Sequence, residues 1–530
     1  MKKILLFMLI FAPFALSAQQ LSKASRKLSL AEYAISNFYV DKVDEDKLVE
    51  DAIVALLEKL DPHSSYTSVE ETKEFNEPLL GNFDGIGIQF QIIKDTLFVI
   101  QAVPGGPSEK VGIMPGDKII EVNDTIIAGV NMKQTDIMKR LSGTKGTVAY
   151  VKVKRNNKQD LISFKIVRDK IPINSLDAAY MADPTVGYIK INRFGANTHE
   201  EFVEAVKKLQ KEGMKSLIVD LQGNGGGFLN AAIDMVDEFI GKDKLIVYTE
   251  GTNQKREEAY STDKGLLKDI PVVFMIDEGS ASASEIMTGA IQDWDRGVLV
   301  GRRSFGKGLV QRPIPLPDGS MIRLTVARYY TPSGRSIQKP YGEGTKKYYE
   351  DLLNRFKGGE LMHADSIHFP DSLKTKTLVE KRTVYGGGGI MPDVFVPIDT
   401  TKYSDYHRNL VYNGIMNQFV ATYVDKHRAE LTKKYKDISS FEKNFQVSPE
   451  MLQSLVNMAN DEKIKFNEEQ YNQSKDMIAL QLKALTARDL FDTAGYFRII
   501  NASDDSYKKA LEIIKNPTLY NKYLKTDTTH

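Results

Sequence analysis

The sequence predicts an α/β protein that has a smaller β-rich domain ahead of its core and helices at both ends. Between residues 169 and 400, apolar strand-like runs alternate with amphipathic helical stretches, as they do in βαβ cores. Residues 81–168 instead carry short strand-like runs between glycine and proline turns. Residues 19–80 and 401–530 place apolar residues at helical spacing. A chain of 530 residues is long enough for several such domains.

The first eighteen residues have the pattern of an export signal. Lys2 and Lys3 precede an apolar run that ends at Ser17-Ala18, so we expect cleavage after Ala18 and a periplasmic or envelope location. A retained anchor is the alternative, although the run is shorter than the ~20 residues that span a bilayer. The chain has no cysteine, which excludes disulfides, thiol catalysis and a lipoprotein anchor. Its 71 basic and 70 acidic residues give a net charge of +1, so the composition does not indicate nucleic-acid binding.

The N-terminal helical pattern runs from about residue 21 to residue 69 and is interrupted at Asp61-Pro62. Proline disfavours helical geometry in the residue before it, so a turn is expected there. His63 lies in this turn, and we expect it to pack or cap the loop.

Residues 81–168 resemble a PDZ domain throughout. The resemblance rests on an ordered series of motifs: 83–90, 96–101, 103–108, 112–117, 119–123 and a helical stretch at 135–141. Gly85 and Gly87 would keep a loop open, so that backbone N–H groups around Ile86 and Ile88 converge on the terminal carboxylate of a peptide. The peptide would then add as an edge strand. The alternatives are a small β-domain used as a spacer, with Ile86 and Ile88 as plain core residues.

The α/β segment centres on an apolar strand, residues 271–276, followed by a serine-rich turn and an amphipathic helix. A hydroxyl in such a turn lies at a helix N-terminus, where free N–H groups and the helix dipole favour a developing negative charge. Three serines compete for this position, Ser280, Ser282 and Ser284, and their spacing does not separate them. Ser282 and Glu285 also fit a helix capping box, which is the alternative interpretation of Ser282.

A serine hydroxyl needs a base, and Lys307 follows the serine turn between two glycines, with no histidine nearby in sequence. A lysine with a pKa near 10.4 becomes a base only if burial lowers that value by several units. Its apolar neighbours suit this demand. If residues 307–311 form a strand, Lys307, Leu309 and Gln311 share one face, and Gln311 can orient the amine without adding charge. An exposed strand lysine is the alternative.

The oxyanion of an acyl-transfer intermediate needs backbone donors that are already in place. Gly226 or Gly227 can supply one N–H from a strand-to-helix turn, and Ala283 can supply another. The glycine run could equally be a plain tight turn.

The sequence does not fit a phosphate-binding loop or the motifs of zinc and nucleophile-elbow hydrolases. Residues 301–308 approach a phosphate-binding loop, but Gly308 stands where serine or threonine must bind magnesium, and the next residues cannot form the required helix. The sequence has no His-Glu-x-x-His zinc motif and no Gly-x-Ser-x-Gly elbow. His363 and His368 lie in a polar stretch, residues 341–380, that we interpret as an excursion from the core without a metal role. Residues 401–530 show no catalytic grouping, so an interaction or dimerisation domain is expected there.

Together these motifs resemble the carboxyl-terminal processing proteases, also called tail-specific proteases, over roughly residues 30–400. The resemblance implies a Ser/Lys endopeptidase of crotonase-like (ClpP-like) α/β fold that needs no cofactor. By motif position it implies Ser282 as nucleophile, Lys307 as general base and Gln311 as the orienting partner of the lysine. It further implies oxyanion donors at Ala283 and Gly227, with Gly226 as the alternative.

In that family the PDZ domain binds substrate C-termini and gates the active site, which implies a carboxylate loop at Gly85–Ile88 and a regulatory relay through Arg168. The sequence departs from the family pattern at Gln222-Gly223 and Gly225, so the geometry of the oxyanion loop is less firmly implied.

We therefore predict an exported serine endopeptidase that recognises apolar C-termini of envelope proteins and cleaves through an acyl-enzyme. Its partners are protein or peptide substrates, and the helical flanks could join two copies. The alternative from another class is a non-catalytic peptide binder or chaperone with a protease-like core. Retention of Ser282, Lys307 and Gln311 together argues against that alternative.

Overall fold

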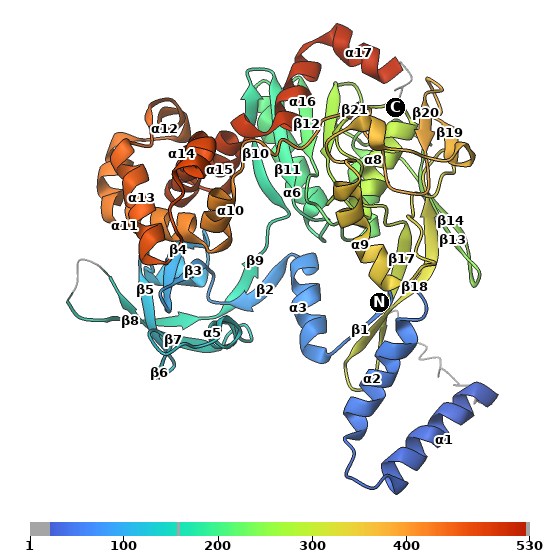
Figure 1. The fold of residues 1–530 in the computed structure, drawn as a ribbon, viewed down its shortest axis with the longest axis horizontal. Coiled ribbons are helices and arrows are strands. Elements are labelled where there is room, and N and C mark those ends of the chain that lie inside the picture. The colour runs from blue at the N-terminus through green and yellow to red at the C-terminus, as the bar shows by residue number, and fades with distance from the viewer. Residues whose placement is uncertain (1–21, 156–158, 526–530) are drawn as a thin grey trace, which may run out of the picture.

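The computed structural model describes residues 22–155 and 159–525. The expected export signal, residues 1–18, lies outside the described residues. Figure 1 shows an α/β core, a β-rich domain beside it, and a group of helices from the C-terminal part of the chain that lies next to both. Within the two described ranges, no helix has the length and apolar character that a membrane crossing requires.

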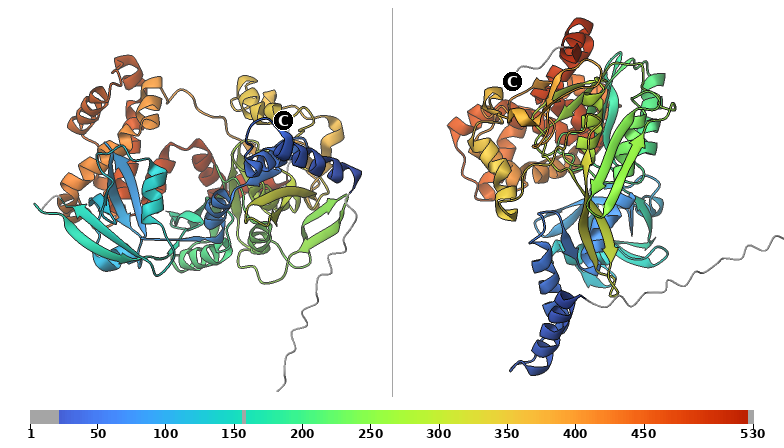
Figure 2. Two further views of the ribbon diagram at one scale, coloured as in Figure 1. Left: turned by 90° about the horizontal axis from the view of Figure 1, so that it is seen from below. Right: turned by 90° about the vertical axis from the view of Figure 1, so that its right-hand side faces the viewer.

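Two N-terminal helices, α1 (Lys23–Phe38) and α2 (Glu45–Leu57), extend away from the body of the molecule, as Figures 1 and 2 both show. Helix α2 ends before the turn at Asp61-Pro62, and a short strand β1 (Ser65–Thr67) follows. Helix α3 (Val69–Leu80) then begins with a capping box and leads into the β-rich domain. Large apolar side chains remain exposed on the first two helices: Leu28, Leu30, Tyr33, Phe38, Val54 and Leu56.

The β-rich domain, named here the β-domain (residues 82–172), is an antiparallel sheet of order β3-β4-β5-β7-β8 with β6 paired to β5. Alternating apolar residues fill its interior, with Ile119 and Val153 fully buried. Its entry strand β2 pairs antiparallel with its exit strand β9, so one two-stranded ribbon joins it to the core. Its elements are β2 (Asn82–Gly85), β3 (Ile88–Ile93), β4 (Thr96–Ala102), α4 (Pro107–Val111), β5 (Lys118–Val122), β6 (Thr125–Ile126), α5 (Gln134–Leu141), β7 (Val148–Lys154), β8 (Ile162–Val167) and β9 (Asp169–Pro172).

The core is built on a six-stranded sheet of order β10-β11-β12-β15-β16-β21, parallel except for the β10–β11 pair. Its central strands are buried on both faces, which explains their continuous apolar sequences. Helices α6, α7 and α8 pack on one face. The elements are β10 (Leu176–Asp183), β11 (Val186–Ile191), α6 (Thr198–Lys211), β12 (Ser216–Asp220), α7 (Leu229–Asp237), β15 (Val272–Ile276), α8 (Ala283–Asp293), β16 (Val298–Gly301) and β21 (Val394–Phe395).

A second, antiparallel sheet has the order β1-β18-β13-β14, with β17 paired to β18. In the chain, its strands β13 and β14 precede the segment that contains Lys307, and its strands β17 and β18 follow that segment. Its remaining elements are β13 (Leu245–Gly251), β14 (Gln254–Tyr260), β17 (Leu309–Pro315) and β18 (Met321–Tyr330).

The polar segment 341–380 packs against the core instead of leaving it. Helix α9 (Thr345–Lys357) buries Arg355, whose guanidinium donates to the Ser304 carbonyl (3.1 Å) and to the Arg303 carbonyl (2.7 Å). The sequence concealed this because the buried contacts are made by polar and charged side chains. Short elements complete the segment and the return to the core: η1 (Ala364–Ser366), η2 (Asp371–Leu373), β19 (Lys374–Lys376) and β20 (Thr383–Tyr385).

The C-terminal helices form two groups, whereas the sequence predicted a single helical segment over residues 401–530. Helices α10 to α14 form a bundle with a core of its own. Helices α16 and α17 instead cover the second face of the six-stranded sheet, where Ile513 packs with Tyr188 and Val273. The elements are α10 (Asp405–Tyr412), α11 (Ile415–Lys434), α12 (Ile438–Asn444), α13 (Pro449–Asp461), α14 (Glu468–Leu490), α15 (Thr493–Ile500), η3 (Asn501–Ser503), α16 (Asp505–Lys515) and α17 (Pro517–Lys525).

Candidate active site

The serine-rich turn connects the carboxyl end of β15 to the N-terminus of α8. Asp277 fixes its first half, because its Oδ1 accepts hydrogen bonds from the N–H groups of Gly223 (2.8 Å) and Gly279 (2.9 Å). Ser282 lies at the junction with the helix and has φ 56° and ψ −112°. This conformation is sparsely populated for residues with a side chain and costs about 1–3 kcal/mol, a strain that is typical of functional positions.

The three candidate serines occupy different environments. The Ser280 hydroxyl is buried and donates to the Leu221 carbonyl (2.8 Å). The Ser284 hydroxyl is also buried and donates to the Asn224 carbonyl (2.9 Å). Ser282 is partly exposed. Of the three, Ser282 therefore has the side chain that a substrate can approach, a distinction that the spacing alone could not supply.

Lys307 lies in the loop between β16 and β17. Burial lowers the pKa of its amine; the Glu285 and Asp61 carboxylates oppose that shift, and the Arg323 cation adds to it. Within the described residues, the Lys307 Nζ makes neither a hydrogen bond nor an ion pair, so the hydrogen bond to Ser282 Oγ that a Ser/Lys mechanism needs is not formed here. The backbone N–H of Lys307 does donate to Glu285 Oε2 (2.9 Å).

Gln311 does not contact Lys307 through a hydrogen bond. Strand β17 begins at Leu309, after Lys307, and a register shift separates Val310 from Gln311, so the expected alternation along 307–311 does not hold. The Gln311 amide donates to Thr325 Oγ1 (3.2 Å), and that hydroxyl donates to Asp61 Oδ1 (3.0 Å). A role for Gln311 in orienting the lysine stays a prediction.

The glycine loop lies directly against the serine turn. Gly226 has φ 100°, and a Cβ there would come within 2.7 Å of the Ala281 carbonyl oxygen and 2.8 Å of Ser282 Cβ. A Cβ on Gly227 would overlap the Phe194 carbonyl oxygen. Among the described residues, neither Gly227 nor Ala283 uses its N–H in a hydrogen bond, whereas the Gly226 N–H donates to Asn224 Oδ1 (2.9 Å). The N–H groups of Gly227 and Ala283 thus have no acceptor among the described residues, whereas that of Gly226 is occupied. An oxyanion role for Gly227 and Ala283 stays a prediction.

Residues from the turn before β1, far from Lys307 in sequence, lie beside Lys307. Asp61 and His63, from the turn before β1, lie near enough to Lys307 to interact with its charge. Burial, followed by repulsion from Lys307, lowers the pKa of His63 to about 4, so the ring is neutral at neutral pH. His63 Nε2 lies 2.8 Å from the Tyr348 hydroxyl on α9. Periodicity could not reveal these partners, and the Asp61-Pro62-His63 turn was the one local signal.

The predicted carboxylate loop and Arg168 both belong to the β-domain. Gly85, Ile86 and Gly87 are buried and Ile88 opens β3, with Gly87 at φ 72°. Arg168 donates to the carbonyls at the end of α5, Arg140 (2.7 Å) and Leu141 (3.1 Å), and also to Thr147 and Val148. These bonds satisfy the C-terminal carbonyls of the helix, and all of them stay within the β-domain. The regulatory role of Arg168 stays a prediction.

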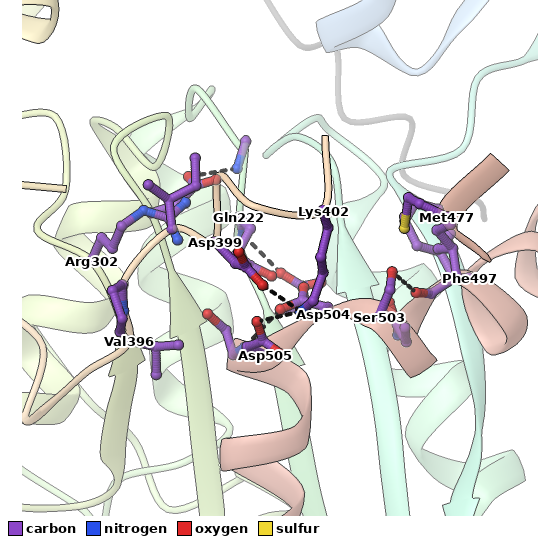
Figure 3. A pocket seen from close by; sticks show the side chains of 18 of the residues that line it. Gln222, Arg302, Val396, Asp399, Lys402, Met477, Phe497, Ser503, Asp504 and Asp505 are labelled. Atoms are coloured by element: carbon purple, nitrogen blue, oxygen red, sulfur yellow. Dashed lines mark hydrogen bonds and ion pairs between the residues drawn. The ribbon is translucent and has the colours of Figure 1, made fainter. Parts of the chain in front are cut away.

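A cavity of about 410 Å³ lies elsewhere, between the core and the C-terminal helices (Figure 3). Its cations are already paired: Lys190 with Asp220 (3.1 Å), Arg302 with Glu278 (2.7 Å), and Lys402 with Asp399 and Asp505 (both 2.9 Å). These pairs leave Lys190, Arg302 and Lys402 no free positive charge to offer a ligand, and we regard the cavity as a seam between domains. No cluster of metal-ligating side chains is found among residues 22–155 and 159–525.

Three parts of the chain match models of known protein families. Residues 185–346 match the model of peptidase family S41, residues 85–166 match the model of the PDZ domain, and residues 406–492 match a family of unknown function. The carboxy-terminal processing protease CtpB of Bacillus subtilis (strain 168) is 35% identical over 320 residues, which are 60% of this chain and 66% of that protein. A probable CtpA-like serine protease of Staphylococcus epidermidis (strain ATCC 12228) is 36% identical over 324 residues, 61% of this chain and 64% of that protein.

The matched region thus spans slightly less than two thirds of either relative. Among solved structures, the photosystem II D1 C-terminal processing protease is 26% identical, covering 60% of this chain and 91% of that one, with a TM-score of 0.34.

Proposed function

Because the chain carries a peptidase domain of family S41 behind a PDZ domain, and is similar to carboxy-terminal processing proteases, we propose that it is a serine endopeptidase that cleaves proteins with exposed apolar C-termini. We propose Ser282 as the nucleophile and Lys307 as the general base. The single observation that supports this best is the strained, partly exposed Ser282 at the N-terminus of α8, beside a glycine loop with a free N–H.

The proposed reaction begins when the Ser282 hydroxyl gives its proton to the neutral Lys307 amine and attacks the scissile carbonyl carbon. The Ala283 and Gly227 N–H groups stabilise the resulting oxyanion, aided by the dipole of α8. The protonated lysine then donates its proton to the leaving amine, which leaves an acyl-enzyme. The same amine then takes a proton from water, and the resulting hydroxide attacks the acyl carbonyl carbon. The bond between that carbon and Ser282 Oγ breaks, the protonated lysine returns its proton to Ser282 Oγ, and the new carboxyl terminus leaves.

The lysine amine needs burial to remain neutral, and it also has to reach the serine. Burial is present in this structure and the contact is not. Catalytic hydrogen bonds commonly tighten only in the complex with substrate. We therefore propose that substrate binding completes the Ser282–Lys307 contact and that Gln311 orients the lysine amine. We also propose that the core has a crotonase-like fold.

The β-domain would deliver the substrate. In the proposed binding mode, the loop at Gly85–Ile88 accepts the terminal carboxylate, and the peptide adds as a strand beside β3. We further propose an exported, periplasmic enzyme that forms a homodimer through its helical flanks, because the large apolar side chains of α1 and α2 face solvent.

The proposal is tested by incubating an unfolded protein with an apolar C-terminus with the wild type, Ser282→Ala and Ser284→Ala. We expect the wild type to cleave and Ser282→Ala to lose cleavage by about 10⁴-fold or more. Ser284→Ala loses only the hydrogen bond to the Asn224 carbonyl and is expected to keep most of the rate. A Ser282→Ala protein that cleaved at the parental rate would refute the nucleophile.

A non-catalytic peptide binder is the second candidate function, and the unformed contact between Ser282 and Lys307 favours it. The same experiment separates the two functions. If neither the wild type nor Ser282→Ala cleaves the tailed protein, while both bind its tail peptide, the chain is a binder.

A further inference from the structure

Two buried side chains, Glu285 and Tyr329, hold the backbone of both proposed catalytic residues. Glu285 lies in the first turn of α8, and its side chain is fully buried. Its Oε2 accepts hydrogen bonds from the N–H of Ser282 (2.8 Å) and the N–H of Lys307 (2.9 Å). Its Oε1 accepts from the Ser304 hydroxyl (2.6 Å) and the Gly306 N–H (2.7 Å). One carboxylate thus joins the serine turn to the lysine loop.

Tyr329 makes the complementary contacts from strand β18. Its ring is 1% exposed, and its hydroxyl lies 2.6 Å from the Lys307 carbonyl oxygen and 3.2 Å from the Ser282 carbonyl oxygen. Both oxygens are acceptors, so the hydroxyl can donate only its single proton between them. Burial raises the pKa of the Tyr329 phenol well above its usual range, and the Glu285 charge adds to this, so the phenol keeps its proton.

The two side chains therefore act on the same two residues from opposite sides, Glu285 on their N–H groups and Tyr329 on their carbonyl groups. Ser282 and Lys307 each donate an N–H to Glu285, and each offers a carbonyl to Tyr329. The residues are 25 positions apart in sequence, so no local interaction could set their separation. Misplacement of a catalytic group by about 1 Å can cost about 10²-fold in rate, so this separation matters for catalysis.

We propose that Glu285 and Tyr329 are positioning residues that fix the distance between the Ser282 and Lys307 backbones. The inference rests on the proposed function. It adds two residues to the site that touch neither the substrate nor the reacting atoms. Substrate binding then needs to move only the lysine side chain.

The carboxylate has a second effect that a purely structural residue would lack. Attraction from Glu285 raises the pKa of Lys307 against the lowering by burial. Glu285→Gln keeps the size of the side chain but removes the charge. It is therefore expected to shift the alkaline rise of kcat to lower pH, while Tyr329→Phe leaves that rise in place.

The test compares Tyr329→Phe and Glu285→Gln with two matched controls in the full chain. Tyr188→Phe removes another buried tyrosine hydroxyl, which donates to Asp220 Oδ2 (2.6 Å), and Glu201→Gln removes another carboxylate that accepts two backbone N–H groups. We measure kcat and KM on a tailed substrate, the pH profile, the Tm, and the titration of Lys307 by NMR. We expect kcat to fall by about 10²-fold in Tyr329→Phe with KM unchanged, and by less than threefold in both controls.

The outcomes separate this inference from the proposed function. If the wild type cleaves and Ser282→Ala does not, but folded Tyr329→Phe and Glu285→Gln match the controls, the positioning role is wrong and the protease stands. If the wild type does not cleave, the proposed function fails, and the titration of Lys307 then tests the positioning role by itself. A Lys307 pKa that is unchanged in Glu285→Gln and in Tyr329→Phe would then overturn the positioning role as well. A lower value in Glu285→Gln alone would support it.

Discussion

The serine turn and the β-domain are attached to the molecule in opposite ways. Hydrogen bonds accepted by the Glu285 carboxylate and by the Asn224 carbonyl hold the turn to loops elsewhere in the core. The β-domain is joined by the β2–β9 ribbon, and its further contacts include exposed ion pairs, Lys139 with Glu70 (2.8 Å) and Lys94 with Glu462 (3.2 Å). Exposed pairs contribute little to stability, whereas buried ones break at high cost. The contrast indicates that the serine turn is held more firmly in the core than the β-domain is held to the rest of the molecule.

The largest expected effect comes from removing the base. Lys307→Met is expected to lower cleavage by about 10³-fold or more, because the variant lacks the proposed base for the Ser282 proton. Binding of the tail peptide to the β-domain should stay within a factor of two, as measured by isothermal titration calorimetry. Loss of binding together with cleavage would mean that the two regions are not independent.

Adding one methyl group to the glycine loop is expected to lower kcat by about 10²-fold. The Cβ of Gly226→Ala would meet Ala281 and Ser282, and the residue has φ 100°, so the turn has to move. Gly225→Ala is the matched control, because a Cβ there has nothing within 4 Å. Steady-state kinetics of both variants measure the effect, and equal rates would show that the loop is looser than the contacts imply.

The buried amine also makes the stability of the core depend on pH. Because the folded state lowers the pKa of Lys307 below 10.5, the unfolded chain binds more protons in the interval between the two values. The stability of the folded state therefore rises with pH across that interval, and at lower pH it carries the full cost of burying the charged amine. Lys307→Met is expected to raise the Tm most near neutral pH and progressively less as the pH approaches 10.5. A Tm difference that does not change with pH would contradict a buried amine.

A smaller effect concerns the β-domain. Replacing the terminal carboxylate of a tail peptide by an amide removes charge-assisted hydrogen bonds, and we expect the Kd to rise by about tenfold or more. Fluorescence anisotropy with the two peptides measures the ratio. Equal affinities would remove the carboxylate loop at Gly85–Ile88 from the proposal.

The smallest effect is expected at the contact between the β-domain and the helical bundle. Glu462→Lys places like charges at Lys94, and we expect the basal cleavage rate to change by less than about threefold. The double variant Lys94→Glu/Glu462→Lys restores the pair and is expected to restore the rate. A large change in the single variant would show that this contact holds the β-domain in place.

The sequence predicted those parts of the site whose signals are local. The apolar strand, the serine turn and the helix follow one another in the chain, and the structure places them at residues 272–293. The choice of Ser282 over its neighbours by geometry needed backbone angles and burial. Glu285 was interpreted only as a helix cap, because its bonds to Ser304 and Gly306 cross about twenty positions. Asp61, Tyr348 and Tyr329 reach the site through packing that no periodicity encodes.

The helices after residue 500 affect when the central sheet of the core can fold. Because α16 and α17 supply the apolar cover for one face of the sheet that holds β15, that face stays uncovered during synthesis until residues beyond 500 have been made. Loss of α16 and α17 is therefore expected to destabilise the sheet that carries the serine turn, although these helices lie on the opposite face of the sheet from α8.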